Sequence, residues 1–323
     1  MSFSLHAHER PADGLLRILV TQLAAARECV ANDGRLTDKE IHNARKSIKR
    51  ARATLRLLRP ALDCSVFKEA NRALRDISRP LTHVRDAKVL LDSLDALRNH
   101  FGDAARCLST DMLEHALQVQ RARARREISA TADTVEQLRS ALRKIETDVK
   151  QWHIKSDKWD LLGTALERIY RDARRAYAKV SEARSDERLH EWRKQVKHYW
   201  YALQILTPLR PGQVGESADR AHKLTDYLGD DHDLANLRRY IGAIDEDEDM
   251  IETLEALIDR RRNDLQDRAF AVGERLLNRK PKRVVRSLKS HWRSWRKSRA
   301  LPSLPEPSPR ARPRSNGNAL HLH

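Results

Sequence analysis

The sequence predicts an all-α protein with two helical halves that arose by internal duplication, each a bundle of about four main helices. Three observations support this fold class. Aromatic residues make up only 5% of the 323 residues and glycine occurs 10 times, whereas charged residues reach 34%, a composition that favours helices over sheets. Apolar residues recur at helical spacing along most of the chain. One basic stretch occurs twice, 148 residues apart, with the same helical pattern.

The first copy of this stretch, residues 41–58, has two distinct faces when it is placed on a helix at about 100° per residue. The apolar face, which we expect to pack against a core, comprises Ala44, Ile48, Ala51, Leu55 and Leu58. The opposite face has no acidic residue and comprises His42, Arg45, Lys46, Lys49, Arg52 and Arg56. At about 1.5 Å per residue this cationic face is about 21 Å long, which suits an extended anion better than a single phosphate.

The second copy, residues 190–206, keeps both faces and both ends. Its basic side carries His190, Arg193, Lys194, Lys197 and the neighbouring His198. A hydroxyl residue, Thr37 or Ser185, stands five residues before each opening histidine, where helix N-caps belong. Pro60 and Pro208 follow the two helices at equivalent positions. Because the faces, the caps and the prolines all recur, we interpret the pair as a duplication.

The two copies differ in charge. Trp200 and Gln204 stand in the second copy where the first has Arg52 and Arg56. The second cationic face is therefore weaker, and we do not expect the two halves to bind an anion equally.

The rest of the first half divides into helices by apolar periodicity and by helix breakers. Residues 15–30 form a helix, and Thr37 with Glu40 makes a capping box before the basic helix. Pro80 is expected to break the next helix, residues 65–79, from another that covers about residues 83–101. A long amphipathic run, residues 104–142, follows, and residues 135–152 either continue or reorient it as a bridge to the second half.

The second half repeats this order. We expect helices over residues 160–180, 190–206, 218–228 and 233–244, with a polar turn at 181–186 and a loop at 208–212. An acidic turn at 245–249 precedes a long helix to about residue 277, and a last basic helix covers 281–299. Residues 1–11 and the proline-rich residues 300–323 are expected to be disordered, which leaves 12–152 and 153–299 as the two bundles.

The net charge of +17 and the isoelectric point near 10.1 indicate a polyanionic partner, such as nucleic acid, an anionic membrane surface or a phosphate polymer. No stretch approaches about 18 uninterrupted apolar residues, and residues 1–14 have no apolar signal core. We therefore expect a soluble, cytoplasmic protein without a membrane partner. Cys29, Cys64 and Cys107 lack metal-ligand spacing and are expected to be reduced core thiols.

Three further arginines are candidate anion ligands. Arg85 and His232, at nearly equivalent places in the two halves, each precede an aspartate. Each aspartate could hold the preceding side chain in position to bind an anion, or it could only stabilise a helix N-terminus. For the aspartates we favour the second, structural role. Arg72 and Arg220 match at the offset of 148 residues and are candidates for an outer ring of ligands.

Metal and catalytic chemistry have less support. His42 and His190 lie among cations that would repel a metal ion, and no paired Glu-x-x-His set indicates a di-iron bundle. No phosphate-binding loop, nucleophile elbow or catalytic triad is visible. An enzyme that acts on phosphate polymers would need a carboxylate cluster for Mg²⁺, which the sequence does not show. We therefore expect no metal, no cofactor and no enzymatic activity.

At the two basic helices the sequence resembles the CHAD family, whose name refers to conserved histidines on an α-helical domain. The resemblance rests on two His-x-x-Arg-Lys-x-x-Lys motifs, which begin at His42 and His190, and it extends over about residues 11–299. A shorter signal in the second half reads Leu228-Gly229-Asp230-Asp231-His232-Asp233. The first half departs from this pattern, since it has Pro80-Leu81 where a Leu-Gly pair is expected.

The resemblance implies two pseudo-symmetric four-helix bundles around a central basic cavity that binds inorganic polyphosphate, and an association with polyphosphate granules. Such domains often accompany a triphosphatase domain, and since none is visible here we expect a stand-alone binding module. Arginine suits this polymer through forked hydrogen bonds, lysine through compact charge, and histidine can donate while neutral. The polyphosphate-binding residues are then His42, Arg45, Lys46, Lys49, Arg52, Arg56, Arg72, Arg85, His190, Arg193, Lys194, Lys197, His198 and Arg220.

The alternative function is that of a nucleic-acid-associated basic helical protein. The net charge supports it, and the rings of Trp292 and Trp295 could stack on bases among the cations of the last helix. Tryptophans at that spacing more often pack a terminal helix onto a bundle, so the phosphate polymer is favoured over nucleic acid.

Overall fold

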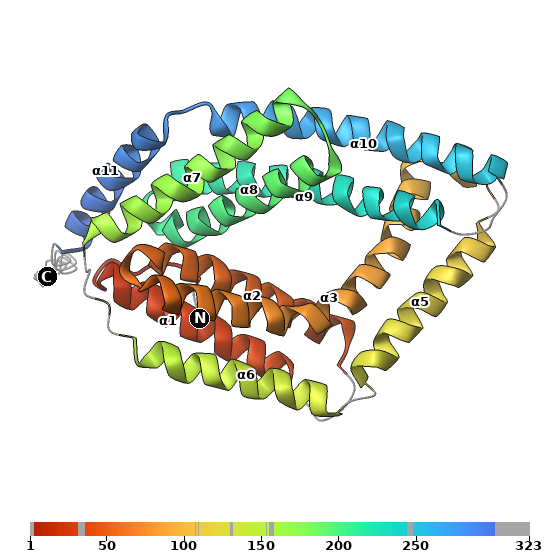
Figure 1. Ribbon diagram of the computed structural model, residues 1–323. Helices are drawn as coiled ribbons and strands as arrows, with labels where there is room; N and C mark the ends of the chain where they lie inside the picture. Colours follow the sequence, from red (N-terminus) through yellow and green to blue (C-terminus); the bar gives the residue numbers. More distant parts are fainter. Residues whose placement is uncertain are drawn as a thin grey trace, which may run out of the picture.

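The computed structural model of the protein describes residues 3–31, 36–106, 108, 110–129, 132–152, 154, 158–243 and 248–300 (Figure 1). Within these residues it contains eleven α-helices, two short 3₁₀ helices and no β-strand, which confirms the all-α class. The α-helices are α1 (Pro11–Cys29), α2 (Asp38–Leu58), α3 (Cys64–Phe101), α4 (Asp103–Arg106), α5 (Asp111–Ser129), α6 (Ala132–Lys150), α7 (Trp159–Glu182), α8 (Asp186–Leu206), α9 (Pro211–Ile241), α10 (Glu248–Leu277) and α11 (Pro281–Ala300). The 3₁₀ helices η1 (Arg59–Ala61) and η2 (Thr207–Leu209) follow the two basic helices α2 and α8.

The helices form two groups that face each other in Figure 1. α1, α2 and α6 lie in the lower group and α7 to α11 in the upper one, while α3 reaches from the first group to α9 and α10 in the second. The single run expected over residues 104–142 is instead divided, because α5 packs against α3 whereas α6 packs against α1. α6 therefore reorients the run, the second of the two expected alternatives, and it belongs to the first group rather than bridging the two groups.

Most of the apolar core is one continuous cluster that both halves of the sequence share. The apolar face predicted for α2 lies in it, with Ala44, Ile48, Ala51, Leu55 and Leu58 at most 1% exposed. The matching face of α8 is equally buried, with Trp192, Val196, Leu203 and Leu206 at most 1% exposed. Because one face of each basic helix is buried in this core, the opposite, cationic face points away from the core. A second cluster joins α3, α5, α9 and α10.

Pro80 does not break its helix, contrary to the expectation from the sequence. α3 continues through Pro80, and its ribbon changes direction along its length in Figure 1. A proline inside a helix removes one hydrogen bond and usually kinks the helix. The helix nevertheless continues because Leu74, Ile77, Leu81 and Val84, on both sides of the proline, are all at most 5% exposed. Tertiary packing of this face outweighs the local preference.

The equivalent segment of the second half is also one continuous helix rather than the two expected over residues 218–228 and 233–244. Pro211 opens α9 at a first-turn position that suits proline, so it is not part of a loop over residues 208–212. The helix passes through Gly229, where the missing side chain leaves room for a neighbour. A Cβ at this position would lie only 3.3 Å from Nη2 of Arg193 on α8.

Residues 3–10 pack against the basic helices, in contrast to the disorder expected for residues 1–11. Leu5 is 3% exposed, and its N–H donates a hydrogen bond to the carbonyl of Ile205 at 3.1 Å. The ring of Phe3 meets the ring of Tyr201 edge-on, and the guanidinium of Arg50 lies 4.6 Å from the Phe3 ring centroid. Two apolar side chains thus anchor a polar segment. Residues 301–323 of the expected tail lie outside the described residues.

Two further expectations can be compared with the structure. No helix in the part of the chain that the structure describes is long and apolar enough to cross a membrane. Cys29 and Cys64 are unpaired, but Cys64 is exposed, so it is not the core thiol that was expected. Cys107 and residues 245–247 of the acidic turn lie outside the described residues.

Gly273 marks a close approach of α10 to α8. A Cβ at this position would lie 2.4 Å from Cζ2 of Trp192, whose side chain is fully buried. We therefore expect Gly273→Ala to lower the free energy of unfolding by about 1–3 kcal/mol, the cost of overpacking a core, as measured by urea titration. Gly212→Ala is the matched control, because a Cβ there would meet no atom within 4 Å. Equal stability of the two variants would contradict this packing.

Candidate functional site

A pocket of about 800 Å³ opens between α2, α3, α8 and α9. Among the described residues, nine lysines and arginines and five aspartates line it, a formal balance of +4 when the histidines are neutral. Seven of the predicted ligands lie on its wall: His42, Arg45, Lys46, Lys49, Arg85, Arg193 and Lys197. These residues come from both halves of the sequence, so the pocket brings together the cationic faces of the two basic helices.

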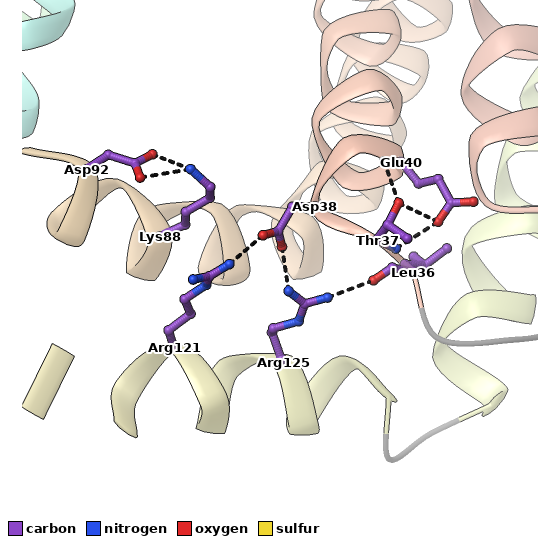
Figure 2. Close-up of polar contacts among 8 residues, drawn as sticks. All are labelled: Leu36, Thr37, Asp38, Glu40, Lys88, Asp92, Arg121 and Arg125. Atoms are coloured by element: carbon purple, nitrogen blue, oxygen red, sulfur yellow. Dashed lines mark hydrogen bonds and ion pairs between the residues drawn. The ribbon is translucent and has the colours of Figure 1, made fainter. Parts of the chain in front are cut away.

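The start of α2 is fixed by two sets of contacts, which Figure 2 shows. Thr37 accepts a hydrogen bond from the N–H of Glu40, whose carboxylate accepts one from the N–H of Thr37, so the predicted capping box is confirmed. Asp38 accepts hydrogen bonds from Arg121 at 2.6 Å and Arg125 at 2.9 Å, both on α5. Asp38 lines the pocket, but these two arginines do not, so its charge is compensated from outside the pocket.

Lys49 and Lys197 occupy equivalent positions in the two copies and share the pocket. Loss of hydration is the main cause that lowers the pKa of Lys49 to about 6 and that of Lys197 to about 7. Positive neighbours add to this effect, Lys197 for Lys49 and Arg193 for Lys197. No hydrogen bond or ion pair holds either ammonium group within the described residues. The protein therefore places two poorly hydrated amino groups in one pocket without a partner among the described residues.

Arg45 and Arg85 extend this cluster on the α3 side. Nη1 of Arg45 donates a hydrogen bond to Thr82, and burial lowers the pKa of Arg45 to about 10. Arg85 pairs with Asp233 of α9, with 3.2 Å between Nη2 and Oδ2, and more loosely with Asp86 at 3.3 Å. This pair joins α3 of the first half of the sequence to α9 of the second half. Asp233 is thus an acidic partner of a cation inside the pocket.

Arg193 has an unsatisfied hydrogen-bond donor. Its Nε is buried and has no hydrogen-bond partner among the described residues. Loss of hydration lowers the pKa of the guanidinium, and Asp233 and Asp230 offset this effect only in part. Since an unpaired buried donor costs about 1–3 kcal/mol, an anion that bound this guanidinium would be favoured.

Asp231 has a structural role that the acidic motif of α9 did not reveal. It is 1% exposed and accepts hydrogen bonds from Arg262 at 3.0 Å and Gln266 at 2.9 Å, both on α10. Arg262 also donates to Asp186 at the start of α8. This buried network ties α8, α9 and α10 together and so holds the α9 wall of the pocket in place.

Arg52, Arg56 and His198 lie outside the pocket lining although the sequence predicts them as ligands. Nε of Arg52 and Nη1 of Arg56 both donate to the side-chain oxygen of Asn71 on α3, at 3.3 and 3.1 Å. Burial and these two arginines lower the pKa of His198 well below its usual range. The three residues therefore form a separate, half-buried cluster outside the pocket lining.

The remaining four predicted ligands also lie away from the pocket lining. The His190 ring lies against the His232 ring at a tilt of 49°, with 4.5 Å between the ring centroids. Lys194, Arg72 and Arg220 each pair with an acidic residue of their own helix, at distances of 2.7, 3.7 and 3.3 Å. The side chains of Arg72 and Arg220 are 77% and 52% exposed, as on an ordinary helix surface.

The sequence interpretation missed several charged residues of the pocket. Lys39, Arg50 and Lys88 line it, and Lys88 pairs with Asp92 on the next turn of α3 (Figure 2). Lys88 lies three residues after Arg85, a spacing that places both side chains on one face of a helix. That signal could have found Lys88, but no local pattern links Arg50 or Lys39 to α9.

The two tryptophans of α11 pack inward. The Trp292 and Trp159 rings lie 5.7 Å apart between centroids, and both Trp292 and Trp295 contact the main core while half-buried. Their packing favours a structural role over base stacking. No group of three histidine, cysteine, aspartate or glutamate residues among those described could hold a metal ion.

The fold and the pocket define an all-α protein in which two similar basic helices border one cationic pocket. A family model described as the CHAD domain matches residues 14–242, which is most of the chain, so the chain belongs to the CHAD domain family. The resemblance found at the two basic helices is therefore confirmed. No match was found among curated proteins.

Two solved structures can be superimposed on this chain, and the first of them has a similar fold. PptA from Streptomyces chartreusis superimposes with a TM-score of 0.59 at 16% sequence identity, over 84% of this chain and 100% of that chain. The CHAD domain from the plant Ricinus communis superimposes with a TM-score of 0.48 at 11% identity, over 91% of this chain and 95% of that chain. At 16% identity the likeness to PptA shows the fold alone.

Proposed function

We propose that this protein binds inorganic polyphosphate in the pocket between α2, α3, α8 and α9, as a binding module rather than an enzyme. One observation carries the proposal: five cations of both halves, Arg45, Lys49, Arg85, Arg193 and Lys197, converge on one pocket. Among the described residues only Arg85 of these five has a carboxylate within ion-pair distance. Such a cluster is unfavourable in the free protein and becomes favourable when a polyanion fills it.

A polymer without bases fits this pocket better than nucleic acid does. The two aromatic rings of the lining, Trp200 and Tyr201, stack on each other with 4.6 Å between centroids, and Trp200 also contacts His222. Rings that already contact each other offer few free faces to bases. Closely spaced phosphates, in contrast, need only the arginine and lysine donors that line the pocket.

The proposal includes an internal duplication, with residues 12–152 and 153–299 as pseudo-symmetric four-helix bundles and the pocket as their central basic cavity. The support is that Lys49 and Lys197, which are matched positions of the two basic helices, both line the pocket and lie close enough for each charge to act on the other. Equivalent positions contact each other near a two-fold axis. A location in the cytoplasm, at polyphosphate granules, belongs to the same proposal.

Competition at physiological salt tests the proposed ligand. Labelled long-chain polyphosphate bound to the protein is displaced with unlabelled polyphosphate, single-stranded RNA or duplex DNA at matched phosphate concentrations. We expect the nucleic acids to compete at least about a hundredfold more weakly, and the logarithm of the affinity to fall linearly with the logarithm of salt concentration. Equal competition by RNA or DNA would favour the nucleic-acid alternative, and an affinity independent of salt would contradict both.

Asp233→Asn is expected to strengthen polyphosphate binding by roughly tenfold. Asp233 occupies Arg85 in the free protein, and removing one competing charge-assisted hydrogen bond is worth about 1.5 kcal/mol, or about a factor of ten. Asp259→Asn is the matched control, because Asp259 also pairs with an arginine, Arg238, but lies outside the pocket lining. Weaker binding by the Asp233 variant than by the control would count against the assignment of this pocket.

A further inference from the structure

A second basic cleft, of about 880 Å³, lies between α7 and the junction of α10 with α11. It shares no lining residue with the pocket between α2, α3, α8 and α9. Its charged lining consists of Arg171, Arg174, Arg175, Lys280 and Lys282 together with the acidic residues Glu167 and Glu274. The cleft is thus cationic and separate from the proposed polyphosphate pocket.

Four of the five cations in this cleft have no acidic partner. Arg171 donates to Glu167 at 2.8 Å, whereas Arg174, Arg175, Lys280 and Lys282 are exposed and have no ion pair within the described residues. Exposed helical cations commonly pair with an acidic side chain three or four residues away, as Arg72, Lys150 and Arg220 do here. A cleft in which such pairs are missing has a positive potential that attracts an anion.

The cations approach the cleft from two elements. Arg171, Arg174 and Arg175 lie at i, i+3 and i+4 on one face of α7, over about 6 Å of helix. Lys280 and Lys282 lie where the chain enters α11. This arrangement suits several neighbouring charges on one chain better than a single small anion.

Among the described residues, one aromatic side chain lines the cleft, and it does not favour nucleic acid. Its ring, that of Tyr177, packs against Trp192 and Phe270, with centroids 5.2 and 5.9 Å apart. A ring packed in this way is not free to stack on a base, which is how single-stranded nucleic acids are usually held. The chemistry of the cleft therefore fits a linear anion without bases.

We propose that this cleft is a second binding site for a segment of inorganic polyphosphate, so that one protein molecule holds two segments of the polymer. The choice of ligand rests on the proposed function, but the cleft and the pocket bind independently. Lys280 and Lys282 lie beyond residues 14–242, which the CHAD domain model matches. Two sites on one protein increase avidity for a long polymer and allow different polymer chains to be cross-linked.

Calorimetric titration of the full chain with a short linear polyphosphate of defined length tests this proposal. The cleft variant is Arg174→Gln, Arg175→Gln, Lys280→Gln and Lys282→Gln, and the pocket variant is Lys49→Met with Lys197→Met. The charge-matched control is Arg10→Gln, Arg143→Gln, Lys150→Gln and Arg268→Gln, four exposed side chains that pair with acidic residues. We expect two equivalents bound by the wild type and the control, and one by each of the other variants.

The outcomes separate this proposal from the proposed function. A cleft variant that still binds two equivalents overturns the second site, as does a pocket variant that binds none. Loss of all binding in the cleft variant, with none lost in the pocket variant, would support binding in the cleft and contradict the proposed binding in the pocket. Displacement from the cleft by RNA as effectively as by polyphosphate would make it a nucleic-acid surface instead.

Lysine acetylation followed by mass spectrometry gives a second measurement that needs no variant. We expect saturating short-chain polyphosphate to protect Lys280 and Lys282 from acetylation at least several-fold, while the exposed Lys144 and Lys150 of α6 react as in the free protein. Equal reactivity of all four lysines with and without the polymer would overturn the second site.

Discussion

Replacing Lys49 and Lys197 together by methionine is expected to weaken polyphosphate binding in the pocket at least about a hundredfold and to stabilise the free protein. Two lost charge-assisted hydrogen bonds at about 1.5 kcal/mol each amount to roughly 3 kcal/mol, and 1.4 kcal/mol is a factor of ten in affinity. Stability rises because both ammonium groups are poorly hydrated and unpaired. Methionine keeps an unbranched apolar side chain and removes the charge.

Titration calorimetry measures the affinity of this variant, and scanning calorimetry without ligand measures its melting temperature. We expect the melting temperature to rise by about 2 °C or more, the shift that roughly 1 kcal/mol produces in a protein of this size. Lys144→Met with Lys150→Met removes the same charge from exposed positions on α6. This control should neither weaken polyphosphate binding in the pocket nor raise the melting temperature. Undiminished affinity, or a lower melting temperature than the control, would contradict the role given to these lysines.

Polyphosphate affinity is also expected to rise as the pH falls from about 8 to about 6. The pKa of Lys49 is lowered to about 6 and that of Lys197 to about 7, so both are largely neutral at pH 8. A bound polyanion raises these pKa values, and binding therefore takes up protons. Linkage then gives up to about a tenfold gain in affinity per pH unit for each proton taken up. Calorimetry in two buffers of different ionisation enthalpy measures this uptake directly.

The groups that face the two lysines set the size of this effect. Arg45, Arg85 and Arg193 keep the pKa values of the lysines low, whereas Asp226 and Asp233 raise that of Lys197. His42, His190, His198 and His232 all have lowered pKa values, chiefly through loss of hydration. Because a lowered pKa keeps a histidine neutral near pH 7, the lysines should dominate the dependence. An unchanged pH dependence in the Lys49→Met, Lys197→Met variant would contradict this assignment.

The same pKa values predict the opposite trend for the stability of the free protein. Between about pH 6 and the ordinary lysine pKa of about 10.4, the folded chain binds fewer protons at these sites than the unfolded chain does. The contribution of the two lysines to stability therefore increases as the pH rises through this range. A polyanion that binds at low pH compensates for the stability lost there.

Local features of the fold could be predicted from the sequence because local chemistry determines them. The apolar faces of α2 and α8 follow from helical periodicity, and Thr37 and Ser185 act as N-caps through hydrogen bonds within one turn. Pro80 was misjudged because the burial of Leu74, Ile77 and Leu81 is a tertiary effect. The same holds for residues 3–10, whose partners on α8 are about two hundred residues away in the sequence.

The candidate site was harder to predict than the basic helices that border it. The offset of 148 residues identified Lys49 and Lys197 as equivalent, and both line the pocket. The same offset linked Arg72 to Arg220, yet both lie exposed on the surface. A match between two copies of a sequence pattern does not tell which way the matched side chains point. Asp233 was expected to be structural, but its pairing with Arg85 depends on how α3 crosses α9.

The structure of the protein crystallised with a short linear polyphosphate tests the central claim most directly. We predict phosphate groups in the pocket between α2, α3, α8 and α9, with their oxygens within hydrogen-bond distance of Lys49, Arg193 and Lys197. Phosphate groups bound only outside this pocket, with these three side chains left without a ligand, would contradict the proposed function.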